Sequence, residues 1–297
     1  MVMFLLFTAV TLVTGVISNL FILVVIFMEQ NRFLTMTPSN QIQFTMSLNN
    51  IFLQFMESMS SPDFSFKFFI IKEILQVRSL FYTFFLSLSY WLCAGLCALY
   101  CVTVVSCKNR LITSLKMRLP VLVPKLLLVT ALGCFSISVP SIWYLNIVPQ
   151  PDVTGNLTTN NIPNSQVMYH DYLHYQVFFL SLGGIVPLII SITCLLITVT
   201  SLLRHVWRIK LNATNMSDPQ LDAHYRASKT MVMLATVFVV LIMTQLTYLT
   251  LNSATVSLEM MIVHCLAQLL PTELSVILIL SSCKHKRALC RIVPCIK

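Results

Sequence analysis

Residues 174–203 read HYQVFFLSLGGIVPLIISITCLLITVTSLL, and basic residues follow at Arg204, Arg208 and Lys210. An α-helix needs about 20 predominantly apolar residues to cross the hydrocarbon core of a bilayer. This stretch is long enough, and its basic end suits the headgroup region, where Lys and Arg side chains place their charges. It therefore predicts a membrane-spanning helix that continues for some residues beyond the membrane.

Six further apolar stretches of this kind lie along the chain. Together they predict seven helices, near residues 3–28, 42–60, 76–105, 120–143, 174–203, 228–251 and 257–281. Between and after them lie a loop at 144–173, a loop at 204–227 and a tail at 282–297. Because 57% of the 297 residues are apolar and 10% are charged, we expect an all-α fold with a single membrane domain, 1–297.

The basic residues indicate how these helices are oriented. All 19 Lys and Arg except Lys67, Lys72 and Arg78 fall into alternate gaps, those after the first, third, fifth and seventh helices, or within six residues of such a gap. By the positive-inside rule these gaps face the cytoplasm, which places the N-terminus outside and the C-terminus inside. The expected location is the plasma membrane. The net charge of +9 is explained by these short segments beside anionic lipid, so no nucleic-acid partner is expected.

No catalytic or cofactor motif is present in the sequence. HExxH, GxSxG, a P-loop and a pair of intramembrane Asp residues are all missing, so an enzyme is not expected. Cys93, Cys97 and Cys101 recur every fourth residue, which we interpret as packing along one helix face rather than as a metal site. Neither a cofactor nor a metal is therefore expected.

The loop at 204–227 is bounded by a specific motif. Residues 201–205 read SLLRH and residues 218–229 read DPQLDAHYRASK. Asp218 before Pro219 is a strong helix start signal, because Asp caps the free N–H groups and Pro suits the first helical position. The pattern resembles the type 2 (bitter) taste receptor family, which has Ser-Leu-x-x-His and Asp-Pro-x-x-x-Ala-His-x-x-Ala-x-Lys at these places. The resemblance covers essentially the whole chain, including Gly15 with Asn19.

Several positions depart from the family pattern. Asn50 stands where the family has Arg, Thr103 where it has Lys, and Leu270-Pro271 where it has His-Pro. A second His of the seventh helix is replaced by Leu274. The resemblance implies a G-protein-coupled receptor that binds small bitter molecules and acts through a gustducin-like α subunit, while these departures bear on its basal activity. Assembly into homo- or hetero-oligomers is left open.

Polar and aromatic residues in the outer halves of the helices are the expected ligand contacts, because such side chains suit varied amphipathic molecules. They are Trp91, Tyr90, Ser87, Tyr175, Gln245, Tyr248, Glu259 and His264. Trp91 also matches a family position implicated in binding. For Tyr82, Tyr172 and Tyr175, a place in the interfacial aromatic belt is the alternative interpretation.

The cytoplasmic ends of the helices carry the expected G-protein contacts. They are Lys116, Arg118, His205, Arg208, His224 and Lys229. Asn156 begins an Asn-Leu-Thr acceptor in the outer loop and is the expected glycosylation site. Cys283, Cys290 and Cys295 follow the last helix among basic residues and are candidates for palmitoylation.

Glu273 lies within the seventh apolar stretch, where a charged side chain costs at least about 2.5 kcal/mol. One hypothesis is that it faces Asn19 and Asn50 in a carboxyl–amide network, and the other is a protonated carboxyl bonded within its own helix. For the whole chain, a vomeronasal-type pheromone receptor and a small transporter or channel remain the alternatives. The motif at 218–229 argues against the first, and the scarcity of intramembrane charges argues against the second.

Overall fold

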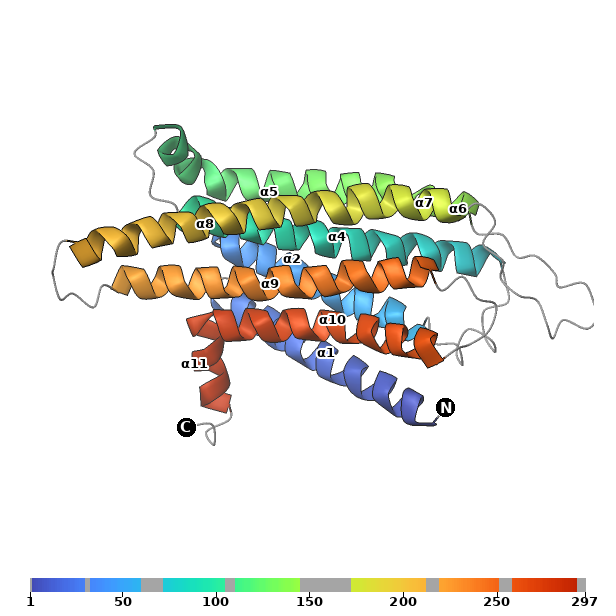
Figure 1. Cartoon of the computed structure of the whole chain (residues 1–297). Coiled ribbons are helices and arrows are strands. Elements are labelled where there is room, and N and C mark those ends of the chain that lie inside the picture. Colours follow the sequence, from blue (N-terminus) through green and yellow to red (C-terminus); the bar gives the residue numbers. More distant parts are fainter. Residues whose placement is uncertain are drawn as a thin grey trace, which may run out of the picture.

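The described residues form a bundle of long helices with its two chain ends at opposite ends of the bundle (Figure 1). The computed structural model describes residues 2–29, 33–59, 72–104, 110–144, 172–211, 219–250 and 258–292. Within these ranges every regular element is a helix. The end that carries the N-terminus is called the outer end below, following the charge distribution, and the opposite end is called the cytoplasmic end.

Seven helical segments traverse the bundle. They are α1 (Val2–Glu29), α2 (Pro38–Met59), α4 (Lys72–Val104), α5 (Arg110–Ser138), α7 (Tyr172–Phe179) continuing through η2 (Leu180–Ile185) into α8 (Val186–Leu211), α9 (Pro219–Thr250) and α10 (Leu258–Ser281). Short elements complete the described chain, namely η1 (Phe33–Thr35), α6 (Ser141–Tyr144) and α11 (Cys283–Ile292). The expected seven-helix class is confirmed.

Helix α4 occupies the centre of the bundle. It packs against α2, α5, α8 and α9, while α1 and α10 pack against each other and against α2. Tyr90 of α4 stacks on Phe238 of α9, with ring centroids 4.9 Å apart and planes inclined by 8°. Both side chains are fully buried. Because lipid is as apolar as these side chains, such close packing contributes to helix association in the membrane.

Helix α2 differs in composition from the other traversing helices. The six helical regions that are long and apolar enough to span a bilayer, judged within the described residues, lie in α1, α4, α5, α7–α8, α9 and α10. α2 instead buries amide side chains such as Gln41, Asn49 and Gln54, and it exposes Phe52 and Phe55 on its opposite face. The amide nitrogens of these three side chains donate hydrogen bonds to carbonyl groups of other elements, so a low mean hydropathy is compatible with a traversing helix.

The fourth traversing helix begins earlier than predicted and contains two prolines. The sequence predicts a helix from residue 120 to 143, but α5 begins at Arg110 and runs through Pro120 and Pro124. A proline biases the residue before it away from the helical conformation without always ending a helix. Pro140 does mark a break, because α5 ends at Ser138 and α6 begins at Ser141.

The fifth traversing helix contains a π-helical segment that the sequence pattern does not predict. η2 brings Gly183 and Gly184 against α4 and α9. A Cβ on Gly183 would lie 3.2 Å from Oγ of Ser87 on α4, and one on Gly184 would lie 3.8 Å from a methyl group of Ile242 on α9. The missing side chains therefore permit a close approach of this helix to the bundle centre.

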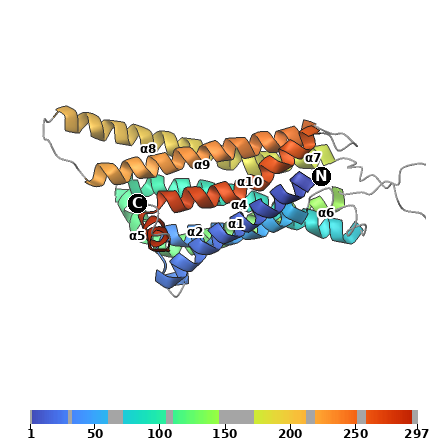
Figure 2. The same ribbon diagram turned by 90° about the horizontal axis from the view of Figure 1, so that it is seen from below.

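The cytoplasmic end carries two features beyond the traversing segments. α8 and α9 project past the other helices, and α11 turns away from the axis of α10 (Figures 1 and 2). α9 begins at Pro219, where the sequence places the helix start. The predicted tail at 282–297 contains the helix α11, and Ser282 caps its first turn by accepting a hydrogen bond from the backbone N–H of His285, at 3.4 Å.

Candidate functional site

Polar side chains from four helices meet in the outer half of the bundle. We call this group the outer cluster; its members are Glu57 of α2, Arg78 and Tyr82 of α4, Gln245 of α9, and His264 and Gln268 of α10. α2 ends at Met59 and α4 begins at Lys72, so Glu57, Arg78 and Tyr82 all lie within about three turns of the outer helix ends. The cluster joins helices that are far apart in the sequence.

Tyr82 connects three of these helices. Its hydroxyl accepts a hydrogen bond from Nε2 of Gln245 at 3.2 Å, and it interacts with the carboxyl of Glu57. Arg78, one turn earlier on α4, acts electrostatically on the same carboxyl and donates from Nη1 to the carbonyl of Met59 at 3.0 Å. Glu57 is 4% exposed. A buried carboxyl is stable only with such partners.

The α10 side of the cluster is built on one helical turn. His264 and Gln268 are four residues apart, and their Nε2 atoms lie 3.0 Å from each other. Because an amide nitrogen donates and does not accept, Nε2 of His264 is the acceptor in this orientation. The imidazole ring also packs against Phe4 of α1, with centroids 5.6 Å apart, and it lies in the electrostatic field of Arg78. The ring is therefore oriented by groups from three helices.

A second set of polar contacts, the amide network, lies deeper and ties α2 to its neighbours. Gln54 donates from Nε2 to the carbonyl of Gln268 at 3.0 Å. Asn49 donates from Nδ2 to Oγ of Ser89 at 2.7 Å and to the carbonyl of Phe85 at 3.0 Å. Asn50 donates from Nδ2 to Oδ1 of Asn19 at 3.3 Å. Amide hydrogen bonds of this kind are typically worth about 0.6 kcal/mol each between membrane helices.

The hypothesis that placed Glu273 in this network is wrong. Asn19 does bond with Asn50, but its Nδ2 donates to the carbonyls of Gly15 and Pro271, at 2.8 Å and 3.4 Å. The side chain of Glu273 is exposed on another face of α10. At the preceding Pro271 the backbone turns its carbonyl towards α1, and this carbonyl takes the place that the hypothesis gave to the carboxyl.

The predicted ligand contacts do not all join the outer cluster. Gln245 and His264 belong to it. Ser87 and Tyr90 are fully buried farther along α4, and Tyr175 is buried with its hydroxyl 3.5 Å from the carbonyl of Ser138. Trp91 is partly buried against the hydrophobic core, nine residues or about 14 Å along the axis from Tyr82.

The remaining predicted contacts lie at the outer rim or outside the described residues. Glu259 is exposed in the first turn of α10. The side chain of Tyr248, near the end of α9, lies outside the described part, as do Asn156 and its loop. The predicted ligand contacts that can be placed therefore divide between the outer cluster, a deeper group on α4 and α7, and the rim.

Four members of the outer cluster are missing from the predicted ligand set. The sequence offers a place in the aromatic belt as an interpretation of Tyr82, and Arg78 enters only as one of the three basic residues on the outer side. The sequence does contain one signal for these residues, which is their spacing. Arg78 and Tyr82 are four residues apart, as are His264 and Gln268, so each pair shares a helix face. Glu57 shows no such partner along its own helix, and only the packing of α2 against α4 brings it to Tyr82.

At the cytoplasmic end, three of the predicted G-protein contacts can be placed. Lys116 donates from Nζ to the carbonyl of Thr103 at 3.1 Å, while Arg118 on α5 and Lys229 on α9 are exposed. The side chains of His205, Arg208 and His224 lie outside the described part of the chain. A basic surface at this end therefore includes at least α5 and α9.

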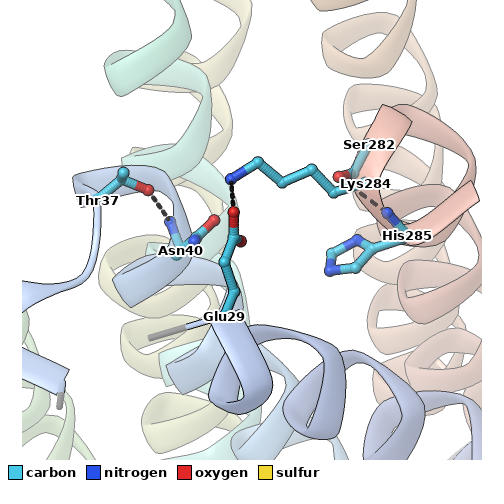
Figure 3. Close-up of polar contacts among 6 residues, drawn as sticks. All are labelled: Glu29, Thr37, Asn40, Ser282, Lys284 and His285. Atoms are coloured by element: carbon cyan, nitrogen blue, oxygen red, sulfur yellow. Dashed lines mark hydrogen bonds and ion pairs between the residues drawn. The ribbon is translucent and has the colours of Figure 1, made fainter. Parts of the chain in front are cut away.

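Polar side chains of α1, the start of α2 and the start of α11 lie near one another at the cytoplasmic end of the bundle (Figure 3). Nζ of Lys284 lies 2.6 Å from Oε1 of Glu29, and both side chains are about half exposed. His285 is buried beside them, with Nδ1 3.4 Å from the carbonyl of Leu278. Burial lowers the pKa of His285 below its usual range, and the Leu278 carbonyl opposes this effect. On α2, Oγ1 of Thr37 accepts from the backbone N–H of Asn40 at 3.4 Å.

Seven helices traverse the bundle, a cluster of polar side chains joins four of them near the outer end, and basic residues lie at the cytoplasmic end. This is the architecture of a membrane receptor of the G-protein-coupled type. The model of the taste receptor protein (TAS2R) family matches residues 1–297. The chain therefore belongs to the type 2 taste receptor family, the bitter taste receptors, and is a multi-pass membrane protein.

Curated relatives agree with this assignment. The chain is 32% identical to taste receptor type 2 member 8 of Pongo pygmaeus over 234 residues, which cover 76% of this chain and 74% of the relative. It is 26% identical to member 41 of Mus musculus over 73% of this chain and 71% of that protein. Member 40 of Gallus gallus is 30% identical over 50% of this chain and 48% of the relative. The vomeronasal and transporter alternatives are set aside.

Proposed function

We propose that this receptor binds small bitter molecules in a pocket whose outer wall is the outer cluster, and that it signals through a gustducin-like heterotrimeric G protein. The observation that carries the proposal is the buried Glu57 carboxyl beside the Tyr82 hydroxyl. A buried carboxyl is a strong partner for a ligand ammonium group, since hydrogen bonds to charged groups contribute about 1.5–3 kcal/mol.

The floor of the proposed pocket is formed by hydroxyl groups of α4. The phenolic oxygen of Tyr90 is buried and has no hydrogen-bond partner among the described residues, while the buried Oγ of Ser87 interacts with the Cys134 thiol. They are three residues apart, so they share a helix face, and that face meets η2 and α9. Buried polar groups without partners are uncommon in folded proteins. A ligand that reaches this depth supplies the hydrogen-bond partner that the Tyr90 hydroxyl lacks, and Trp91 borders the same level.

The test is calcium release in cells that express the chain with a chimeric gustducin-type α subunit and receive a panel of bitter compounds, cationic and neutral. For cationic agonists, Glu57→Gln is expected to raise the half-maximal concentration about tenfold or more, because a charge-assisted bond is lost. Glu73→Gln is the matched control, since Glu73 is an exposed carboxyl in the first turn of α4 on the same side of the membrane.

Two further variants separate the wall from the floor. Tyr82→Phe removes only the hydroxyl that joins Glu57 and Gln245, so it is expected to weaken cationic agonists at unchanged surface level. Trp91→Ala tests the deeper level and is expected to weaken neutral and cationic agonists alike. Equal responses of wild type, E57Q and Y82F would contradict the position of the pocket, and surface expression without any response would contradict the function.

Coupling is tested separately by nucleotide exchange in membranes that contain a single purified α subunit. Exchange is expected to be faster with a gustducin-type subunit than with a stimulatory one. Lys229→Gln is expected to slow exchange without changing agonist affinity, because Lys229 is exposed near the cytoplasmic end of the membrane-spanning part of α9. Lys125→Gln, an exposed basic residue on α5, is the control. A faster response with the stimulatory subunit would refute the proposed partner.

A further inference from the structure

Glu273 lies on the face of α10 that is turned to the lipid. Leu266 and Leu280 are seven residues before and after it, which is about two helical turns, so the three side chains are in line. Both leucines are exposed, at 42% and 48%, and so are Ile262 and Val276 on the same face. A carboxyl therefore interrupts a continuous apolar surface inside the membrane-spanning part of α10.

A shallow groove surrounds this carboxyl. It is lined by one residue of α9, Val237, and by Leu269, Thr272, Glu273, Val276 and Ile277 of α10, and its volume is about 250 Å³. Within the described parts of the chain, no side chain forms a hydrogen bond or ion pair with the Glu273 carboxyl. A charged group on a membrane helix is costly, and such residues commonly mark a functional site with a specific partner.

The groove is separate from the outer cluster. Glu273 follows His264 by nine residues, and nine residues are two and a half turns, so the two side chains point to opposite sides of α10. His264 is buried in the bundle, whereas Glu273 is exposed outside it. A molecule in the groove therefore reaches Glu273 from the bilayer, and the outer pocket does not have to be open for it to bind.

We propose that the α9–α10 groove binds a hydrophobic amine that dissolves in the bilayer, with the amine bonded to Glu273. The amine and the carboxyl share a proton in a charge-assisted hydrogen bond, which is among the strongest contacts available in an apolar medium. The lining residues apart from Thr272 and Glu273 are apolar, so they suit an alkyl or aryl body. The groove is slightly smaller than the sites that hold drug-sized ligands, which indicates a small amine.

Phospholipid headgroups are poorly placed to fill this role. Glu273 is eight residues before the end of α10 at Ser281, which corresponds to about 12 Å along the helix. The occupant must therefore carry its donor into the hydrocarbon, where lipid headgroups do not reside. A carboxylate or phosphate would in addition be repelled by Glu273. This site lies beyond the proposed bitter-ligand pocket and does not depend on it.

The test uses purified receptor in phosphatidylcholine nanodiscs and a photoreactive aryl-diazirine that carries a butylamine chain. Labelled peptides are then mapped by mass spectrometry. The amine is expected to label α9 and α10, and Glu273→Gln is expected to reduce this labelling about tenfold, a change equal to about 1.4 kcal/mol of binding free energy. The corresponding butanol compound, which cannot form the charged pair, is expected to label α10 about tenfold less than the amine does.

Two tryptophan variants locate the occupant. Val276→Trp fills the groove and is expected to abolish labelling, while Val240→Trp places the same bulk on a lipid-exposed position of α9 outside the lining. Thermal unfolding of each variant checks that the fold is intact. Equal labelling of wild type, E273Q and V276W would overturn the proposal. So would labelling that is absent from α10, or crosslinking of two receptor copies through Glu273 without added amine.

Discussion

Gly15 lies where α1, α2 and α10 meet, and its replacement by alanine is a direct test of the packing. A Cβ at this position would lie 2.7 Å from Oγ1 of Thr272 and 3.0 Å from Oε1 of Gln54. Ordinary contact begins near 3.4 Å, so the threonine hydroxyl must move by about 0.7 Å and the glutamine oxygen by about 0.4 Å. Both side chains are held by interhelical bonds, to Thr11 and Gln268.

Two effects compete in the Gly15→Ala variant. Alanine is the better helix former by about 0.5–1 kcal/mol, and this favours the variant. Overpacking of a filled contact costs about 1–3 kcal/mol, and this opposes it. The clash is the larger effect because two neighbouring side chains from different helices must shift together. We expect a net loss of about 1–2 kcal/mol, which corresponds to a melting temperature lower by about 2–8 °C.

Thermal unfolding with a maleimide dye that fluoresces on reaction with thiols is a suitable assay. Cys93, Cys97 and Cys134 are free and almost fully buried, so their reaction reports loss of the fold. Gly95→Ala and Gly133→Ala are the matched controls, because a Cβ at either position meets nothing within 4 Å. Both controls are expected to be as stable as wild type or slightly more stable, owing to the gain in helix propensity.

A second substitution distinguishes the clash from other causes. Thr272→Ala removes the hydroxyl nearest to the new Cβ, so the double variant G15A/T272A is expected to recover part of the lost stability. Recovery would appear as a non-additive interaction between two residues in contact. The packing argument is refuted if G15A has the same melting temperature as G95A and G133A. It is also refuted if the double variant G15A/T272A has a lower melting temperature than G15A.

Three further predictions concern polar contacts. Asn49→Ala removes two bonds to α4, one of them to Ser89, and is expected to cost about 1–2 kcal/mol in the same thiol-reaction assay; a melting temperature equal to wild type would contradict it. In a double-mutant cycle, Glu29→Gln and Lys284→Gln are expected to show a coupling below about 1 kcal/mol that vanishes in high salt, because the pair is about half exposed; a larger, salt-independent coupling would refute a surface pair. Burial lowers the pKa of His285, so the unfolded chain binds more protons than the folded one. The free energy of unfolding is therefore expected to fall as the pH drops below about 6.5. His285→Gln is expected to weaken this pH dependence in thermal unfolding from about pH 5 to 8, and an unchanged dependence would contradict the prediction.

Much of this receptor could be predicted from local pattern. The long apolar segments and the alternation of basic gaps predict the seven-helix class and its orientation, because membrane thickness and the positive-inside rule act on short stretches of chain. Asp218 and Pro219 predict the start of α9 for a similarly local reason, and the helix does begin at Pro219. The motif at 218–229 predicts the family that the whole-chain match shows.

The tertiary structure decided where polar side chains point and which of them meet. Tyr82 joins Glu57 and Gln245 because α2, α4 and α9 pack together, and no spacing in the sequence encodes that meeting. Asn19 bonds to the carbonyl of Pro271, whereas Glu273 faces the lipid; two residues further along a helix turn a side chain by about 200°. In an apolar chain most faces of a helix look alike in sequence, so burial, partner and exposure depend on how the helices rotate against one another.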